Sequence, residues 1–344
     1  MEYNRKNNKY YPINSIKDRI DIVFYHMNCA DGTLSCALWL YNNMYRSIET
    51  HIYPIQPSFD IISFFSENKI KRYIRNKTVN YIFLDVVPIR IKDFIDRYQY
   101  ITIIDHHIGN KEIIDTIEIT NHITIDFKPD STYGAAKQVI HLIKDRLSQN
   151  QVDFSMKIAA MDMWNTDEYT DVNYINYGIK YYCFKKDIKM LSPDDFIKFS
   201  YDGMKSIEFF VKIGKQWYTK AEEYILKKFN KIDLTNLIVY QIYRICIVDL
   251  DRIFTSGPYM KQKSIMTNLI CFMLENAPQL KNRIFGKNIN TLAFINGSGV
   301  SLRSISSNKD LDMDYLAKRI CKGGGHKPAA GCGLKHFIEY IQST

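Results

Sequence analysis

Carboxylate and imidazole side chains follow three apolar stretches of the sequence, at the point where each stretch ends. Asp105-His106-His107 comes directly after the β-branched stretch 100–104, His26 follows residues 21–25, and Asp85 follows residues 79–84. Such side chains bind hard or borderline divalent metal ions and transfer protons. A single Asp after a strand is commonly a helix cap, and for Asp85 alone that explanation is equally good. Because all three apolar stretches are followed by such side chains, the pattern indicates a shared metal centre.

The elements that must position these residues are strands of a parallel sheet. Short apolar stretches that are rich in β-branched residues and bounded by turn residues indicate buried strands. Strands are expected over residues 21–25, 50–55, 79–84, 100–104 and 122–127, with helical spacing of apolar residues between them. This alternation favours a parallel sheet with right-handed crossovers, in which ligands bind outside the carboxyl ends of the strands. We therefore expect the side chains to meet at one edge.

Two further carboxylates are candidates for the same edge. Asp31 lies in the expected turn between the first strand and a helix over residues 33–43, where helix amides face the site. Asp162 lies near the C-terminal end of a helix expected over residues 153–164, where a carboxylate is unfavourable. A positively charged partner is therefore expected for Asp162.

The second half of the chain is expected to form a helical connector and a smaller α/β domain. A long amphipathic section over residues 195–229 indicates the connector, and strand patterns return after it. The predicted fold class is α/β with two domains, the first built on a mostly parallel sheet flanked by helices. The expected division is an N-terminal tail over 1–19, a first domain over 20–185, the connector over 186–232 and a second domain over 233–344.

Bulk properties agree with two packed domains. The 344 residues exceed a usual single core, and hydrophobic residues make up 46% of them. The net charge of +9 suits an anionic substrate, although a lysine-rich surface explains it nearly as well. Seven Cys residues without a CxxC argue against a disulfide framework and a structural zinc site. Without a signal-peptide core or a membrane-length apolar run, we expect a soluble, cytoplasmic protein with no membrane partner.

Taken in order, the motifs resemble those of the DHH phosphoesterase superfamily. Asp105-His106-His107 is similar to the motif that names the superfamily, and the segment from His26 to Gly32 resembles its first motif. Asp85 is similar to the second motif and Asp162 to the fourth. Within the superfamily, the first motif is most similar to the oligoribonuclease (nanoRNase) and cyclic-nucleotide phosphodiesterase branch.

A further motif resembles the DHH-associated C-terminal domain. Residues 323–331, Gly-Gly-Gly-His-Lys-Pro-Ala-Ala-Gly, are similar to its glycine-rich signature, and Ser301-Leu302-Arg303-Ser304 stands upstream. Glycines let backbone amides approach a phosphate, whereas a lone glycine run is more often a flexible turn. The resemblance extends over roughly residues 20–334. It implies substrate binding by Ser301, Arg303, Gly323, Gly324, Gly325 and His326.

The resemblance also implies a centre of two Mn²⁺ ions, with Mg²⁺ as the alternative. Asp85 would bridge the ions, His26 would bind one of them, and Asp31, His106 and Asp162 would bind the other. Asp105 would hold His106 in one tautomer, and His107 would contact the substrate or protonate the leaving oxygen. Many members have an Asp where this chain has Cys29. Cys29 or Asn28 could replace that ligand, or the site could be weak.

Three functions agree with this pattern. The first is the hydrolysis of short oligonucleotides, from an end, to mononucleotides, and the second is the hydrolysis of cyclic mono- or dinucleotides. The third is non-catalytic binding of nucleotides or nucleic acid by a protein with a decayed metal site. A phosphatase of inorganic phosphate chains is a more distant alternative. The sequence has no obvious extended basic track, which favours short substrates, and a homodimer is an open alternative to a monomer.

Overall fold

The computed structural model describes residues 19–67, 77–98, 100–120, 122–129, 134–162, 171–229, 237–240, 243–254, 263–276, 289–305, 311–326 and 329–343. The chain divides into two compact units, Met1–Lys212 and Ile213–Thr344, and the boundary lies inside helix α10 (Met204–Phe229). This boundary falls within the expected connector, while the four-part division stays a prediction. Of the expected N-terminal tail, all but Arg19 lies outside the described residues.

The first unit is built on a five-stranded parallel sheet, and the predicted α/β fold class is confirmed. The strand order is β2-β1-β3-β4-β5, and every neighbouring pair is parallel. The strands are β1 (Arg19–His26), β2 (Glu49–Ile55), β3 (Thr78–Leu84), β4 (Tyr100–Asp105) and β5 (Ile123–Phe127). Because β1, β3 and β4 are neighbours, the three strands that end in candidate residues deliver them to one edge.

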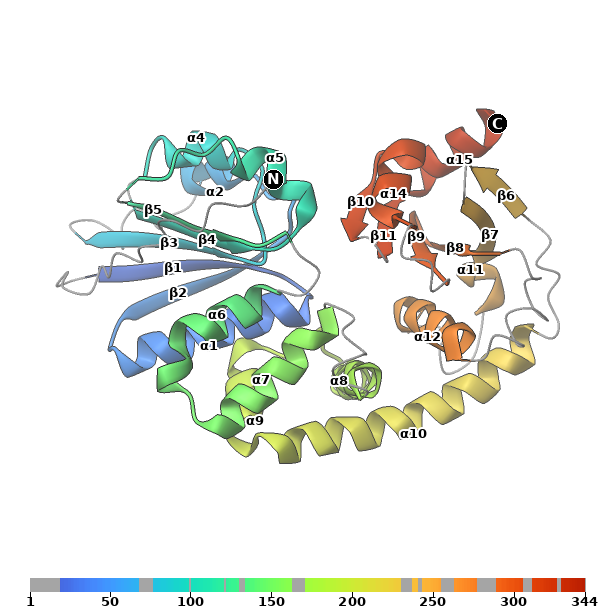
Figure 1. Ribbon diagram of the computed structural model, residues 1–344, viewed down its shortest axis with the longest axis horizontal. Helices are drawn as coiled ribbons and strands as arrows, with labels where there is room; N and C mark the ends of the chain where they lie inside the picture. The colour runs from blue at the N-terminus through green and yellow to red at the C-terminus, as the bar shows by residue number, and fades with distance from the viewer. Residues whose placement is uncertain are drawn as a thin grey trace. The chain divides into compact units, whose positions relative to one another are not determined.

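Helices cover both faces of this sheet (Figure 1). One face carries α2 (Ile61–Glu67) and α4 (Ile91–Ile95), and the other carries α1 (Ala30–Tyr45) and α6 (Ala135–Ile143), with α7 (Gln149–Asp162) packed against these two helices. The core on the α2 side is aromatic, with the ring of Phe24 stacked 5.2 Å from that of Phe83. These two rings, from β1 and β3, contribute to holding the central strands in register, since aromatic cross-strand pairs stabilise sheets.

The sequence predicts one helical section over residues 195–229, whereas the structure has two helices, α9 (Pro193–Asp202) and α10. Gly203 separates them with a φ of 55°, a left-handed conformation that residues with a Cβ rarely adopt. The amphipathic pattern continues across the break because both helices bury an apolar stripe. The described part of this unit also contains the short helix α5 (Lys111–Ile114) and helix α8 (Val172–Lys185).

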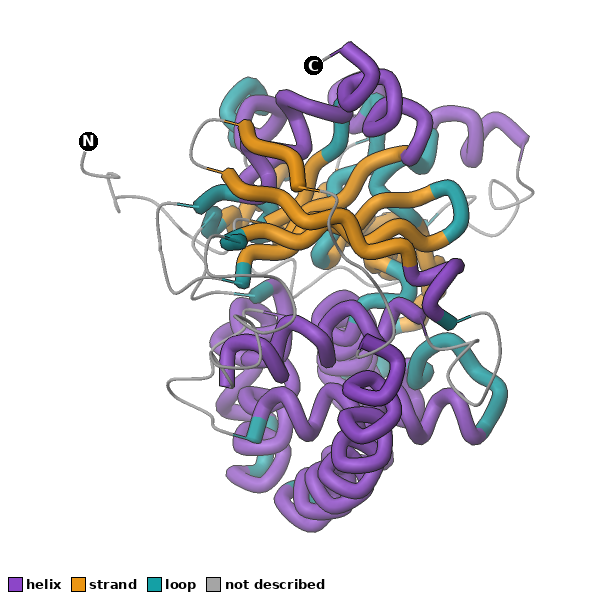
Figure 2. Tube along the Cα trace, turned by 90° about the vertical axis from the view of Figure 1, so that its right-hand side faces the viewer, coloured by secondary structure: helices purple, strands orange, loops and turns teal. Residues whose placement is uncertain are grey.

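The second unit carries a six-stranded sheet in the order β10-β11-β9-β8-β7-β6, antiparallel except for the pair β7–β8. Its strands are β6 (Leu237–Tyr240), β7 (Tyr243–Asp249), β8 (Thr291–Asn296), β9 (Gly299–Ser304), β10 (Gly324–His326) and β11 (Ala329–Gly333). Helices α14 (Met313–Cys321) and α15 (Leu334–Ser343) pack against Val300 and Leu302 of β9, and α12 (Lys263–Asn276) contacts β8 and β9. Figure 2 shows the strands in orange and the helices in purple.

One disulfide lies in this second unit. Cys321, at the end of α14, is bonded to Cys332 of β11, and the other five cysteines are thiols. The sequence argues against a disulfide framework, and this single pair was not foreseen because it forms only when α14 and β11 are packed together. Among the described helices, none combines the length and the apolar character that a membrane span requires.

Candidate metal centre

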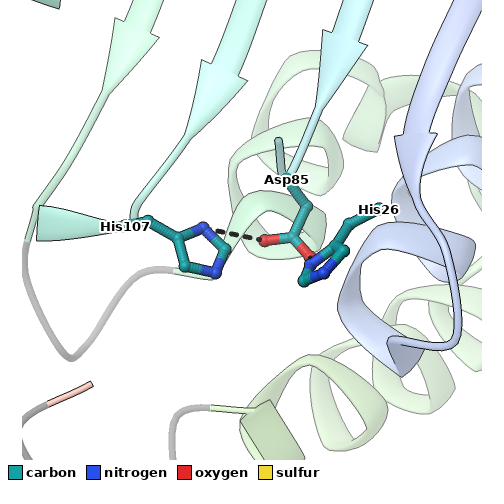
Figure 3. A group of neighbouring side chains, drawn as sticks. All are labelled: His26, Asp85 and His107. Carbon is teal, nitrogen blue, oxygen red and sulfur yellow. Dashed lines mark hydrogen bonds and ion pairs between the residues drawn. The ribbon is translucent and has the colours of Figure 1, made fainter. Parts of the chain in front are cut away.

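The carboxylate of Asp85 lies at the centre of the candidate residues, at the edge where β1, β3 and β4 end. Oδ2 of Asp85 lies 3.3 Å from Nδ1 of His26, and Oδ1 lies 3.7 Å from Nδ1 of His107. Figure 3 shows these three side chains pointing toward one another from three different strand ends. The chain runs from β1 outward to β2 and then back to β3. Asp85 and His26 therefore lie at the switch point of the sheet, the expected place for a ligand.

The backbone at Asp85 has an unusual conformation. Its φ is 61°, which few residues with a Cβ adopt and which costs on the order of 1 kcal/mol. Its amide still donates to the carbonyl of Ile104, at 2.9 Å, so the ladder between β3 and β4 continues to this point. Positive φ values at strand ends occur preferentially at functional sites, where the surrounding structure enforces them.

A second group of ligand atoms shares Asp85 with the first. Nε2 of His106 lies 3.1 Å from Oδ1 of Asp85, 3.8 Å from Oδ2 of Asp31 and 3.3 Å from Oδ2 of Asp162. Asp162 is the last residue of α7. His106 is therefore the positively charged partner that was expected for this carboxylate at the unfavourable end of a helix.

Among the residues that the structure describes, two sets of three could each hold a divalent ion. They are His26, Asp85 and His107, and Asp31, Asp85 and His106, with the ligand atoms of each set within 4.8 Å of one another. Imidazole nitrogens and carboxylate oxygens, without thiolates, suit Mn²⁺ or Mg²⁺ better than a soft metal. The donor set therefore fits the pair of ions that the sequence resemblance implies.

Burial and close charges shift the pKa values of these residues strongly. For His106, burial alone would lower the pKa, but hydrogen bonds with Asp162 and Asp85 raise it to about 12. For His107, burial would lower the pKa, and the charge of Asp105 raises it to about 9. Burial raises the pKa of Asp31, as does repulsion from Asp85. For Asp85, burial acts in the same direction, but hydrogen bonds with His106 and His26 hold its pKa well below the usual value. Perturbed pKa values of this kind are typical of functional sites.

Asp105 contacts His107, whereas the resemblance implies that it orients His106. Oδ1 of Asp105 lies 2.8 Å from Nδ1 of His107, and Oδ2 accepts a hydrogen bond of 2.8 Å from Asn110. Asp105 and His107 are two residues apart in an extended stretch of chain, so their side chains lie on the same side of it. An orienting role of Asp105 toward His106 stays a prediction. Asn110 was not predicted, and nothing in its sequence context distinguishes it from a turn residue.

The N-terminus of α6 holds Asp31, and no pattern in the sequence indicated this contact. The amides of Ala135 and Ala136 donate to the carboxylate of Asp31, over distances of 2.6 and 3.1 Å. The residue before the helix, Gly134, has no side chain to cap it, and Asp31 takes the place of a side-chain cap.

Cys29 belongs to neither set of ligands. Its Sγ lies 3.7 Å from Oδ1 of Asp162. Burial raises the pKa of the Cys29 thiol well above its usual value, and repulsion from Asp85, Asp162 and Asp31 adds to this effect. In the absence of a metal ion the residue is therefore a neutral thiol that donates to a carboxylate, rather than a thiolate ligand.

The other predicted residues lie in the second unit, on β9 and β10. Ser301 and Arg303 alternate along β9 with the buried residues Val300 and Leu302, so they face away from α14. Burial lowers the pKa of the Arg303 guanidinium. Of His326, the backbone pairs with Ala329, and its side chain lies outside the described residues.

Packing alone accounts for part of the glycine run. A Cβ at Gly323 would lie 2.1 Å from the carbonyl oxygen of Gly331, so no other residue fits there. The amide of Gly323 donates to Ala317 at 3.0 Å, and that of Gly325 donates to Oδ1 of Asp314 at 2.9 Å. These two amides already have partners within the protein. Substrate binding by this segment stays a prediction.

Comparisons with known proteins give distant structural likenesses. No family model and no curated protein matches the chain. An exopolyphosphatase-related protein from Bacteroides fragilis is 15% identical, with a TM-score of 0.45 over 95% of this chain and 91% of that one. RecJ from Thermus thermophilus, in complex with Mn²⁺, is 10% identical, with a TM-score of 0.49 over 94% of this chain and 51% of that one. PggH, a pGpG-specific phosphodiesterase from Vibrio cholerae, is 13% identical, with a TM-score of 0.44 over 94% and 97%.

These likenesses, with identities of at most 15% and TM-scores below 0.5, assign no activity to the chain. The resemblance to the DHH phosphoesterase superfamily therefore rests on the ordered motifs of the sequence.

Proposed function

We propose that the chain is a metal-dependent phosphodiesterase that hydrolyses short oligonucleotides, from an end, to mononucleotides. The position of Asp85 carries this proposal. Its Oδ2 lies 3.3 Å from His26, and its Oδ1 lies 3.1 Å from His106. A buried carboxylate shared between two sets of imidazole and carboxylate donors is the arrangement that a pair of divalent ions requires to act on one phosphoryl group.

Two divalent ions, when bound, generate a nucleophile from water at neutral pH and offset the charge on the phosphoryl oxygens. His26, Asp85 and His107 would hold one ion, and Asp31, Asp85 and His106, with Asp162 beside them, would hold the other. Asp105 engages Nδ1 of His107 at 2.8 Å. This contact holds the orientation of the His107 ring, which would bind an ion or give a proton to the leaving oxygen.

The second unit would bind the part of the substrate that does not react. Arg303 has the planar fork that pairs with a phosphate through two hydrogen bonds, and Ser301 lies on the same face of β9. We assign these residues, the glycine run and His326 to substrate binding, and the second unit to the C-terminal domain of the superfamily. The sequence has no extended basic track, which supports a short substrate over a long strand.

A panel of phosphodiesters tests this function. Purified protein with Mn²⁺ is incubated with an end-labelled dinucleotide, a longer single strand and a cyclic dinucleotide, and the products are resolved over time. We expect the dinucleotide to be cleaved fastest, with mononucleotides as products. Preferred cleavage of the cyclic substrate would favour the alternative activity, which the same site could perform.

Two variants make the panel specific for the site. Asp85→Asn is expected to abolish turnover, whereas Asp93→Asn, at an exposed carboxylate of the same unit that pairs with Arg90, should leave it unchanged. Nucleotide binding without hydrolysis of any substrate by the wild type would contradict the proposal and favour a non-catalytic binding protein.

A further inference from the structure

Helix α6 begins against the carboxylate of Asp31, which lies 104 positions before Ala135 in the sequence. The amide of Ala135 donates to Oδ2 at 2.6 Å, and the amide of Ala136 donates to Oδ1 at 3.1 Å. Asp31 is fully buried, with 0% of its surface exposed. Both carboxylate oxygens are therefore fixed by backbone groups of one helix, rather than by flexible side chains.

Gly134, the residue before α6, is a glycine for reasons of space. Its φ of −69° and ψ of 161° are extended values that any residue adopts, so the backbone does not require glycine. A Cβ at this position, however, would lie 2.8 Å from Oδ1 of Asp31 and 3.1 Å from both Cγ and Oδ2. Any side chain at position 134 would push the carboxylate out of its place.

The place of this carboxylate matters because Asp31 faces the second set of ligand atoms. Its Oδ2 lies 3.8 Å from Nε2 of His106, and both belong with Asp85 to a set whose ligand atoms are within 4.8 Å. The last torsion of an Asp side chain is broad, so the carboxylate does not hold one orientation by itself. Two amides, at the positive end of a helix, hold it there and offset its repulsion from Asp85.

We propose that Gly134 and the first two amides of α6 are positioning elements of the metal centre, which hold the Asp31 carboxylate where it can serve as a ligand. The inference rests on the proposed function, because it assumes that Asp31 binds an ion. Gly134 acts only through Asp31, so its effect on metal binding should vanish when that carboxylate is removed.

A double-mutant cycle tests this role. The wild type, Gly134→Ala, Asp31→Ser and the double variant are each titrated with Mn²⁺, with free Mn²⁺ followed by electron paramagnetic resonance, and their metal-free unfolding temperatures are measured. Gly134→Ala is expected to weaken Mn²⁺ binding by about 10- to 100-fold, the usual effect of disturbing a group that orients a ligand. In the Asp31→Ser background, where the space is free, the same change should alter neither the affinity nor the unfolding temperature. Gly109→Ala is the matched control, since a Cβ there meets nothing within 4 Å.

The outcomes separate the inference from the proposed function. If the wild type binds Mn²⁺ and Gly134→Ala binds it equally well, the positioning role is overturned while the proposed function stands. If the wild type binds no Mn²⁺, the proposed function itself fails and the role fails with it. A Gly134→Ala variant that unfolds in both backgrounds shows that the glycine serves only the packing of α6, which also overturns the role. If the single variant Gly134→Ala unfolds and the double variant with Asp31→Ser folds, the result supports the contact between position 134 and the carboxylate.

Discussion

Nδ1 of His107 lies 2.8 Å from Oδ1 of Asp105, two residues earlier in the chain. The second oxygen of Asp105 is bound by Asn110, so the carboxylate cannot turn away from the ring. A carboxylate in this position fixes both the orientation and the tautomer of an imidazole. The contact between Asp105 and His107 therefore sets the orientation of the His107 ring.

Replacing this carboxylate by an amide should reduce activity without loss of the fold. We expect Asp105→Asn to lower Mn²⁺ affinity or kcat by about 10- to 100-fold, because the amide can hold His107 in the wrong tautomer. Steady-state kinetics and Mn²⁺ titration measure the effect. Asn110→Ala, which leaves the Asp105–His107 contact in place, is the milder comparison. If Asp105→Asn and Asn110→Ala behave alike, Asp105 does not orient His107.

Removing the shared carboxylate should affect both sets of ligands together. Asp85→Ala is expected to abolish binding of both ions, rather than of one, since Asp85 is the member common to the two sets. Without metal, the variant should also lose stability, because protonated His106 loses its nearest carboxylate partner and keeps Asp162. The stoichiometry of bound Mn²⁺ and chemical denaturation in a chelator give the two readouts. Retention of one bound ion would show that the two sets are independent.

The stability of the metal-free protein should fall as the pH rises above neutrality. The pKa of His107 is raised to about 9 and that of His106 to about 12, whereas an unfolded histidine titrates near 6.5. Groups with a raised folded pKa contribute stability that is complete below the unfolded pKa and is lost as the pH rises toward the folded one. Between about pH 6.5 and 9 both histidines contribute to this loss.

Unfolding in a chelator at a series of pH values measures this dependence. The variant His107→Gln should show a shallower decline than the wild type in the same window, because one proton instead of two is involved. Equal slopes for the two proteins would contradict the assignment of His107 as a protonated group in the metal-free state.

Breaking the disulfide between Cys321 and Cys332 should destabilise the second unit. The bond closes a short loop, with a sequence separation of 11. By restricting the unfolded chain, such a bond adds about 3 kcal/mol to the free energy of unfolding. We expect a lower unfolding temperature in a reducing agent, and the same temperature for Cys321→Ser with and without it. Cys246→Ser, at a buried thiol of the same unit, controls for the loss of a cysteine. An unfolding temperature of the wild type that does not respond to reduction would show that the bond is absent in solution.

The local pattern of the sequence was sufficient for the parallel sheet and for the edge at which the site lies. The sequence predicts five strands, including residues 100–104, because strands that are buried on both faces need apolar stretches. It also predicts that the Asp and His residues at the strand ends lie together, because parallel strands share one carboxyl edge. Asp162 was also predictable, since a carboxylate at the C-terminal end of a helix requires a positive partner.

Tertiary structure alone decided how these residues pair. The contact of α6 with Asp31 joins residues 104 positions apart, and the carboxylate of Asp105 has partners in both His107 and Asn110. The break at Gly203 and the bond between Cys321 and Cys332 likewise depend on the packing of whole elements. Periodicity reports which face of an element is buried, but not which element covers it, and the orientation of each side chain in this site is set by the elements that cover it.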